Sequence, residues 1–212
     1  HSISDAAALA IYTPAGIIVH TGDFKIDYTP VFGDAIDLGR FAELGKKGVL
    51  ALMCESTNVE REGYTPSERT VGRTLRHLFD ENKDHRIIVA TFASNVDRVQ
   101  QIIDCAEKYG RKVAFSGRSM VNYMDVAQKL GYLHLPENIL IDIDMLDKYM
   151  PQQVVLVTTG SQGEPMSALS RMAYSDHRKV MVGEGDFIII SANPIPGNEK
   201  TVGNVVDELL KK

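Results

Sequence analysis

The stretch "RIIVATFASNVDRVQQII" (residues 86–103) decides the fold class, because it contains a strand, a polar loop and a helix in succession. "RIIVATF" (86–92) is a continuous apolar run, which is typical of a strand buried on both faces of a sheet. From about Ser94 onward, apolar residues recur at helical spacing along one face: Val96, Val99, Ile102, Ile103 and Ala106. A strand followed directly by a helix predicts one unit of a parallel α/β sheet.

The same unit recurs on both sides of this stretch. "VLALMC" (49–54) is an apolar run expected to be a parallel strand buried on both faces, and "TPSERTVGRTLRHLFDE" (65–81) follows as a helix. Thr65 is its expected N-cap, with Pro66 at the first position and Glu68 closing a capping box. Further elements are expected at 112–115, 118–130, 153–160, 186–192 and 201–212, with "ILIDI" (139–143) as a candidate short strand. The alternation implies a doubly wound, mostly parallel sheet.

Residues 6–27 follow a different pattern. Two apolar runs flank a Thr13-Pro14-Ala15-Gly16 turn, and this predicts a β-hairpin. Residues 28–47 contain scattered glycine and proline and form the expected boundary. We therefore expect the chain to divide into a segment 1–45 and a domain 46–212.

Composition excludes several classes of protein. The chain has 212 residues, 44% of them hydrophobic and 24% charged, as in an ordinary globular protein. Its net charge of −5 argues against a basic nucleic-acid-binding domain, so any contact with nucleic acid would be local. No stretch approaches the ~20 apolar residues of a membrane span. Cys54 and Cys105 are expected to be reduced, buried thiols of a cytoplasmic protein. The start at His1, without an initiator methionine, suggests an excised piece.

Three polar loops directly follow predicted strands: "CEST" (54–57), "FASN" (92–95) and "TTGSQGEP" (158–165). In doubly wound sheets, ligands bind beyond the carboxyl ends of the strands. These loops are therefore the candidate site, although every loop of this kind must be polar to some degree.

Together the motifs resemble the bacterial ribonuclease J family, in the β-CASP group of the metallo-β-lactamase superfamily. The resemblance covers essentially the whole chain, and these stretches carry it in the family's order: "HSISDAAALAIYTPAGIIVHTGDFKID", "CEST", "ATFASNVDRVQQI", "TTGSQGEP" and "NPIPGNE". It implies a β-CASP domain over 46–212 with a mostly parallel, doubly wound sheet. It also implies that the hairpin in 1–45 belongs to a metallo-β-lactamase fold.

The resemblance further implies a two-metal site. Asp23 of "HTGD" would bridge two divalent ions and His1 of "HSI" would ligate one of them. A carboxylate has two oxygens for ions about 3.5–4 Å apart, and an imidazole suits zinc or manganese. We expect zinc, with manganese or magnesium as alternatives. Read without the family, Asp23 is a turn residue and His1 a surface residue. The superfamily's His-x-His-x-Asp-His motif does not occur in this sequence, so the expected site is incomplete here and the fragment alone is expected to be inactive.

Further roles are carried over from the family. Glu55 would act beside Asp23 in catalysis, by positioning water, a ligand histidine or the scissile phosphate. Arg118 is a candidate phosphate contact, and Gly160 and Ser161 belong to a signature near the cleft, where glycine lets the backbone approach the substrate. The alternatives are a solvated carboxylate at Glu55 and a plain glycine-rich turn at 160–165.

Ser94, Asn95 and Val96 match the family's pocket for an RNA 5′ monophosphate. A turn from strand to helix presents backbone N–H groups and the positive end of a dipole to a phosphate. The alternative is that Ser94 caps its helix, with Asp97 closing a capping box. Asp97 departs from the family's Ser-Asn-Ile-His-Arg form and puts a strict preference for 5′ monophosphate in doubt.

None of the other histidines has the spacing of a metal ligand. His20 is expected to be a packing residue or one that supports a ligand, and His177 is expected among surface charges, with His77, His85 and His134 equally uninformative.

The function implied by the resemblance is that of a 5′-exonuclease and endonuclease. The full-length protein would hydrolyse RNA phosphodiester bonds with two metal ions, in mRNA decay and rRNA maturation in the cytoplasm, as a homodimer or homotetramer with RNA-decay partners and no membrane contact. Two alternatives remain at this point. One is a metallo-β-lactamase-fold hydrolase of another, small substrate, and the other is an RNA-binding or dimerisation module without activity of its own.

Overall fold

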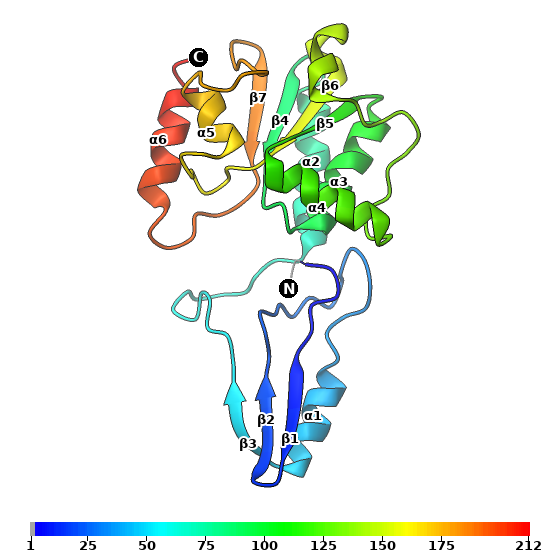
Figure 1. Ribbon diagram of the computed structural model, residues 1–212, viewed down its shortest axis with the longest axis vertical. Helices are drawn as coiled ribbons and strands as arrows, with labels where there is room; N and C mark the ends of the chain where they lie inside the picture. The colour runs from blue at the N-terminus through cyan, green and yellow to red at the C-terminus, as the bar shows by residue number, and fades with distance from the viewer. Residues whose placement is uncertain (1–2) are drawn as a thin grey trace. The chain divides into compact units, whose positions relative to one another are not determined.

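The computed structural model describes residues 3–212, which form two compact units that divide between Val71 and Gly72 (Figure 1). The sequence pattern placed the division at residues 45 and 46 instead, and the assignment of 1–45 to a metallo-β-lactamase segment stays a prediction. No helix within 3–212 has the length and apolar character needed to cross a membrane.

The first unit contains a three-stranded sheet and one helix (Figure 1). Strands β1 (Leu9–Thr13) and β2 (Gly16–His20) form the predicted antiparallel hairpin. The Thr13 hydroxyl donates to the carbonyl oxygen of Gly16 (2.8 Å) and so closes the turn. Strand β3 (Val49–Met53) lies parallel to β2, and helix α1 (Leu38–Lys47) precedes it.

Strand β3 differs from its prediction in both partner and burial. It pairs with β2 and not with the large parallel sheet, and all five of its residues are exposed. The buried cluster of this unit is small and consists of Ile17, Val19 and Leu44. The apolar run therefore identified a strand correctly, but burial on both faces was wrong because no second layer covers β3 within the described residues. Cys54, which follows it, is exposed as well, contrary to expectation.

Helix α2 (Glu68–Glu81) contains the division between the units and starts later than predicted. Thr65 does not cap it. Instead, the Ser67 hydroxyl accepts from the backbone N–H of Arg69 (3.2 Å), and the Asp27 carboxylate accepts from that of Glu68 (3.2 Å). A carboxylate at this position satisfies a helix N–H group and interacts favourably with the helix dipole.

The second unit is a doubly wound, fully parallel sheet, as the alternating pattern predicted. Its strands are β4 (Arg86–Ala90), β5 (Lys112–Ser116), β6 (Val154–Thr158) and β7 (Asp186–Ile190), in the order β5-β6-β4-β7.

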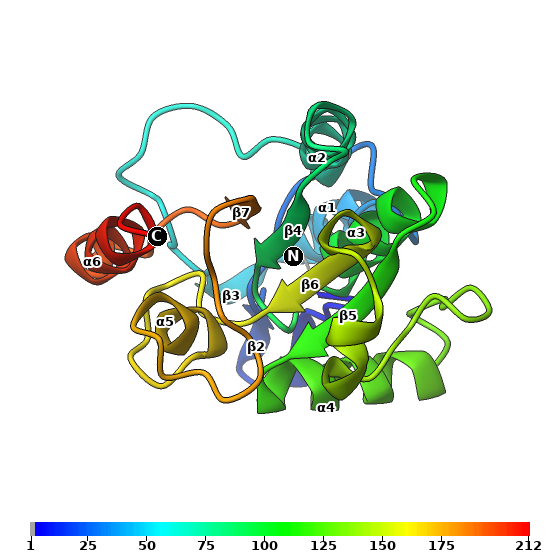
Figure 2. The ribbon, with the colours of Figure 1, turned by 90° about the horizontal axis from the view of Figure 1, so that it is seen from above.

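Helices cover both faces of this sheet, as Figure 2 shows from above. Helices α2 and α3 (Val96–Lys108) lie on one face, and α4 (Arg118–Lys129) and α5 (Ala168–Ala173) on the other. Helix α6 (Glu199–Leu209) packs beside α5. Two short 3₁₀ helices, η1 (Ile143–Lys148) and η2 (Pro151–Gln153), precede β6.

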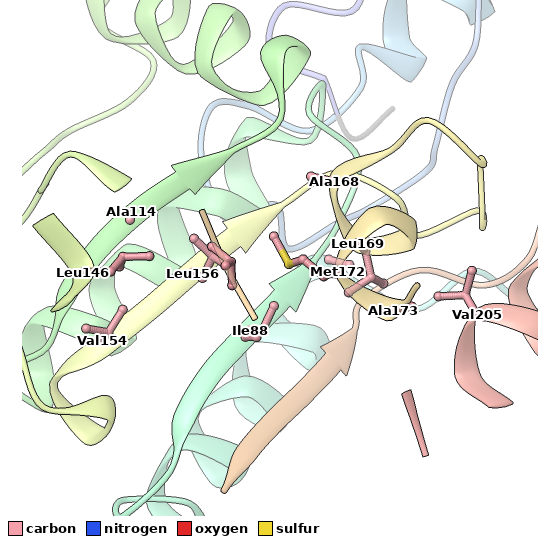
Figure 3. Close-up of a cluster of buried hydrophobic side chains, with 12 residues drawn as sticks. Ile88, Ala114, Leu146, Val154, Leu156, Ala168, Leu169, Met172, Ala173 and Val205 are labelled. Atoms are coloured by element: carbon pink, nitrogen blue, oxygen red, sulfur yellow. The ribbon is translucent and has the colours of Figure 1, made fainter. Parts of the chain in front are cut away.

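One buried cluster of the second unit lies between the sheet and α5 (Figure 3), and further fully buried side chains come from α2 and α3. Ile88 and Leu156 from the strands meet Leu169 and Met172 from α5, and all four are fully buried. The candidate strand 139–143 is not one of the sheet's strands. It forms an isolated bridge beside β5, in which the N–H of Val113 donates to the carbonyl oxygen of Ile139 (2.8 Å) and the N–H of Ile141 donates to that of Val113 (2.9 Å).

Two arginines at the amino ends of strands stabilise this sheet. Arg86 donates to both carboxylate oxygens of Asp186 (2.7 and 2.6 Å), and so joins the amino ends of β4 and β7. Arg111, which is 3% exposed, donates to three backbone carbonyls after α2, those of His85, Asn82 and Lys83. Burial lowers the pKa of Arg111, and the carbonyls at the negative end of the helix offset the desolvation of its charge.

Candidate functional site

Each unit has one polar edge, at the carboxyl ends of its parallel strands. In the first unit, the N–H of Thr21 donates to the carbonyl oxygen of Met53 (3.0 Å), and Thr21 Oγ1 accepts from the N–H of Glu55 (3.3 Å). Thr21 therefore holds the ends of β2 and β3 together. As a result, the predicted catalytic residues Asp23 and Glu55 follow the same end of two adjacent strands.

We call this end of β2 and β3, with Asp23 and Glu55, the carboxylate edge. Local contacts shape it. Glu55 Oε2 accepts from the backbone N–H of Thr57 (2.6 Å), whereas the Asp23 side chain is exposed. Gly22, directly before Asp23, has a φ of +60°, and a Cβ there would lie 2.9 Å from the carbonyl oxygen of Ala7. His20 is exposed, and its Nδ1 accepts from the N–H of Gly22 (3.0 Å), so its ring contacts the turn before Asp23.

The carboxylate edge offers only part of a metal site. Oxygen ligands such as Asp23 suit divalent cations, but a zinc site uses three or four protein ligands. Within residues 3–212, no three His, Cys, Asp or Glu side chains are grouped so that they could hold an ion. The other predicted ligand, His1, lies outside the described residues. The described residues therefore do not form a metal site by themselves.

The second edge is formed by the loops after β4, β6 and β7. The N–H of Thr91 donates to the carbonyl oxygen of Thr158 (3.0 Å), and that of Ser191 donates to the carbonyl oxygen of Ala90 (2.8 Å). The "FASN" and "TTGSQGEP" loops and the 191–198 segment thus leave the sheet side by side (Figure 2). We call this the phosphate edge.

Asn95 and not Ser94 caps helix α3. Asn95 Oδ1 accepts from the N–H of Arg98 (3.1 Å), and the N–H of Val96 donates to the Ser94 carbonyl oxygen (3.0 Å). Asn95 and Val96 are buried, whereas Ser94 is half-buried. Within the described residues the Ser94 hydroxyl makes no hydrogen bond, so it is available to a ligand.

The "TTGSQGEP" loop makes several contacts within the protein, whereas its sequence suggested either a contact to substrate or a plain glycine-rich turn. Ser161 is 2% exposed. Gln162 accepts from the N–H of Ile195 (2.7 Å) and donates to the carbonyl oxygen of Asn193 (3.0 Å), which fastens this loop to the one after β7. Gly160 has a φ of +110°, and a side chain there would collide with Ser167 and Leu169. Glycine is therefore required at 160 by the packing of the protein itself.

Arg118 stands at the same edge of the sheet as this loop. It is the first residue of α4 and is exposed. Gly117, the residue that caps α4, has a φ of +99°, and a Cβ there would lie 2.5 Å from Thr159 Oγ1. The end of β5 therefore contacts the loop after β6. Because β5 pairs with β6, Arg118 and Gly160 follow the same end of two adjacent strands.

Two residues of this edge were missed by the sequence analysis. Thr91, directly after β4, is 1% exposed, and its hydroxyl has no hydrogen-bond partner within the described residues. His177, expected at the surface, is half-buried, and its Nε2 lies 3.1 Å from Ser116 Oγ at the end of β5. A threonine directly after a buried strand was a usable signal for the first. No local pattern pointed to the second, because His177 and Ser116 are 61 residues apart.

Comparison with known proteins identifies relatives along the whole chain. Residues 84–209 match the family described as "Ribonuclease J, beta-CASP domain". A protein named Ribonuclease J from Mycobacterium tuberculosis (strain CDC 1551 / Oshkosh) is 54% identical over 211 residues, which cover 100% of this chain and 38% of that protein. Proteins of the same name from Helicobacter pylori (strain J99) and Synechocystis sp. are 50% and 46% identical, over 100% and 99% of the chain.

The chain spans well under half the length of these relatives, namely 38%, 30% and 33%. Among solved structures, a crystal structure of a protein of unknown function from Enterococcus faecalis V583 matches with a TM-score of 0.53 at 19% identity. That match covers 99% of this chain and 54% of the other, and at this identity it supports the fold alone.

Proposed function

Since the chain belongs to the ribonuclease J family and contains its β-CASP domain, we propose that the longer protein hydrolyses RNA phosphodiester bonds with the help of divalent metal ions. The observation that carries the proposal is an identity of 46–54% to proteins named Ribonuclease J over 99–100% of the chain. Because the chain spans only part of those proteins, the activity is assigned to the longer protein and not to residues 1–212 alone.

The carboxylate edge is assigned to catalysis. Asp23 would bridge two ions and His1 would ligate one, with zinc as the expected metal, and Glu55 would orient water or the scissile phosphate. Bound ions lower the pKa of a water molecule and stabilise the charge that develops on phosphorus. The support is that Asp23 and Glu55 follow the same end of paired strands. The further ligands would come from parts of the relatives that this chain does not span.

The phosphate edge is assigned to RNA binding. Ser94, with Asn95 and Val96 at the start of α3, would contact a 5′ phosphate, while Arg118, Gly160 and Ser161 would line the path of the RNA backbone. The available Ser94 hydroxyl and the exposed Arg118 guanidinium support this assignment. Since the net charge is −5, binding would depend on these local groups.

The exposed sheet of the first unit favours a larger assembly. Leu50 and Leu52 of β3 are each 61% exposed, and an apolar strand of this kind is normally covered. We assign its cover to the remaining part of the longer protein. We further propose that the longer protein is a homo-oligomer in the cytoplasm. It would act in RNA decay and rRNA maturation, as both a 5′-exonuclease and an endonuclease.

The test is hydrolysis of end-labelled RNA by the longer protein carrying Asp23→Ala. Cleavage should be abolished while the circular dichroism spectrum is unchanged, because Asp23 is exposed and lies outside the buried cluster of Ile17, Val19 and Leu44. Asp34→Ala is the matched control, since Asp34 is an exposed carboxylate in the same unit, and it should cleave at the wild-type rate. Wild-type turnover by Asp23→Ala would remove Asp23 from the mechanism. RNA binding without cleavage by the wild-type protein would favour a binding module instead.

A further inference from the structure

His177 connects two distant segments of the chain, the loop between α5 and β7 and the carboxyl end of β5. Its Nε2 lies 3.1 Å from Oγ of Ser116, the last residue of β5. Its Nδ1 accepts from the backbone N–H groups of Lys179 (3.3 Å) and Val180 (3.1 Å). In Figure 2, the orange segment after α5 passes the carboxyl end of β5 before it reaches β7. Ser116 itself is 2% exposed, so the contact with His177 is shielded from water.

These contacts determine which ring nitrogen carries the hydrogen. Two N–H groups point at Nδ1, so Nδ1 must present its lone pair, and the hydrogen of the neutral ring is on Nε2. His177 therefore donates to Ser116 Oγ and does not accept its proton, which excludes a serine nucleophile activated by this histidine. A second proton would have to bind Nδ1, and its N–H group would then face the backbone N–H groups of Lys179 and Val180. This arrangement disfavours the protonated ring.

The charges around the ring also favour the neutral form. Burial lowers the pKa of His177 below its ordinary value of 6.5, and Arg171 of α5 and Lys179 of the same loop lower it further. Asp176 acts in the opposite direction, and Lys179 is in turn paired with Asp144 of η1 (2.6 Å). The neutral donor to Ser116 is thus the stable form at neutral pH.

Ser116 stands where β5 turns into the first residues of α4. It pairs with Thr158 of β6, and the next residue, Gly117, is in close contact with Thr159. The first hydrogen bond of α4 joins the N–H of Val121 to the carbonyl oxygen of Gly117 (3.1 Å). The position of Arg118 relative to the phosphate edge therefore depends on how firmly Ser116 and Gly117 are held.

The loop that carries His177 does not need Ser116 to stay in place. Lys179 is paired with Asp144, Val180 is buried in the core, and Arg86 donates to the carbonyl oxygen of Met181 (2.6 Å). The bond from His177 to Ser116 thus joins a segment that is already fixed to a turn that carries an exposed cation. Loss of this hydrogen bond should therefore loosen the Gly117–Arg118 turn and leave the His177 loop in place.

We propose that His177 is a positioning residue for RNA binding, which acts through Ser116 to hold the Gly117–Arg118 turn at the phosphate edge. The inference rests on the proposed function, because it takes Arg118 as a contact to RNA phosphate. Contacts to phosphate position a nucleic acid, so a loosened Arg118 should raise KM and leave kcat unchanged.

Two substitutions separate the roles of the two ring nitrogens. In His177→Asn, the side-chain oxygen can replace Nδ1 as the acceptor for the loop, but the side chain is too short to reach Ser116. In His177→Gln, the side-chain amide can replace Nε2 as the donor to Ser116. Ser116→Ala removes the acceptor, and Lys179→Ala is the matched control, since it breaks the ion pair of the same loop without touching Ser116.

Steady-state cleavage of single-stranded RNA by the longer protein is the measurement. We expect KM to rise about 5-fold to 10-fold in His177→Asn and Ser116→Ala, in line with the loss of one hydrogen bond. His177→Gln and Lys179→Ala should stay near the wild-type KM, and kcat should be unchanged in all four. The double variant H177N/S116A should be no worse than His177→Asn alone, because both remove the same bond.

The pH profile is a readout that loss of stability alone would not produce. Since the pKa of His177 lies below the ordinary value of 6.5, wild-type KM should be constant at neutral pH and should rise in acid, as His177 gains its second proton. His177→Gln has no titrating group at this position and should lack that rise.

An unchanged KM in both His177→Asn and Ser116→Ala would overturn the inference, and so would an equal rise in Lys179→Ala. If the wild-type protein does not cleave RNA, the proposed function fails, and hydrogen exchange of the Val121 amide tests the positioning independently. Faster exchange in His177→Asn than in His177→Gln and Lys179→Ala would support the inference, and equal exchange in all of them would overturn it.

Discussion

At the start of α3, adjacent residues carry two different roles. The buried Asn95 side chain accepts from the N–H of Arg98 and so belongs to the helix, while the half-buried Ser94 hydroxyl has no partner in the described residues. The sequence predicted a helix start near Ser94, and either residue type can cap a helix. Only the backbone path, which places Asn95 immediately before the first helical residue, distinguishes them.

This arrangement predicts opposite effects for two alanine variants. Ser94→Ala in the longer protein should leave the melting temperature unchanged, and it should lower the efficiency of 5′-exonuclease cleavage about tenfold to a hundredfold by removing one donor to a charged phosphate. Asn95→Ala should lower the free energy of unfolding by about 1 kcal/mol through loss of the cap. Thermal melts and cleavage of 5′-monophosphorylated RNA measure both.

Internal cleavage of a long RNA is the control for Ser94→Ala. The chain is then held by many phosphates and needs no end anchor, so this activity should fall less. Equal loss of both activities would make Ser94 a general phosphate contact, and no loss of either would place the 5′-phosphate pocket elsewhere.

At the level of elements, the strands of the large sheet were predictable and several helix boundaries were not. Continuous apolar runs located β4, β6 and β7. Strands β4 and β6 are almost entirely buried, and all five residues of β7 are half-buried. The start of α2 was missed in part because the N–H of Glu68 bonds to Asp27, which lies 41 residues away in the sequence. Contacts over such a separation leave no trace in local spacing.

Asp27 should therefore stabilise the first unit in a pH-dependent way. Burial raises the pKa of its carboxyl group, but hydrogen bonds from Thr29, Ser67 and Glu68, together with Lys25, outweigh burial and bring the pKa below 3.8. Since the folded-state pKa lies below the ordinary value, the stabilisation is present above about pH 4 and is lost as the pH falls further.

The corresponding variant is Asp27→Asn. At pH 7 it should lower the free energy of unfolding by about 1–2 kcal/mol, the range for loss of a helix cap. The difference from wild type should shrink toward pH 3, as urea denaturation at the two pH values will show. A difference that is constant across this range would mean that the charge of Asp27 is not involved.

Two glycines with similar backbone conformations provide a test of loop packing. Gly163 (φ +72°) lies where a Cβ would be 2.6 Å from the backbone of Thr201, at the start of α6, whereas Gly185 (φ +87°) has open space around it. Alanine at either position incurs about 1–2 kcal/mol for the left-handed conformation. Gly163→Ala should lose more stability than Gly185→Ala, because the loop must also move away from α6. Equal losses in thermal melts would contradict the close approach.

At the level of the whole chain, the two units differ in how much apolar surface they bury. The second unit has a continuous core between sheet and helices, while the first has a three-residue buried cluster and an exposed strand β3. The sequence predicted α/β units and a preceding hairpin, and both are present. It could not predict which sheet β3 joins, because an apolar run has the same composition in either sheet.

Hydrogen exchange of the chain 1–212 should reflect this difference. Amides of β1 to β3 should exchange first and those of β4 and β6 last, because protection follows burial and the number of packed layers. In the longer protein, amides 49–53 should become protected if further chain covers β3. Equal protection of β3 and β6 in 1–212 would show that the first unit is stable by itself.

The pairing of β7 with β4 has a consequence for how the protein is made. Arg86 and Asp186, which join these strands, are 100 residues apart. At roughly 5–20 residues per second, a ribosome needs about 5–20 s to travel from one to the other. During that interval the nascent chain carries β4 with at least one edge unpaired, and with both edges unpaired until β6 has been made, so that β4 is open to association with other strands. Translation speed over this stretch, and chaperones that shield the emerging chain, should therefore influence the yield of folded protein.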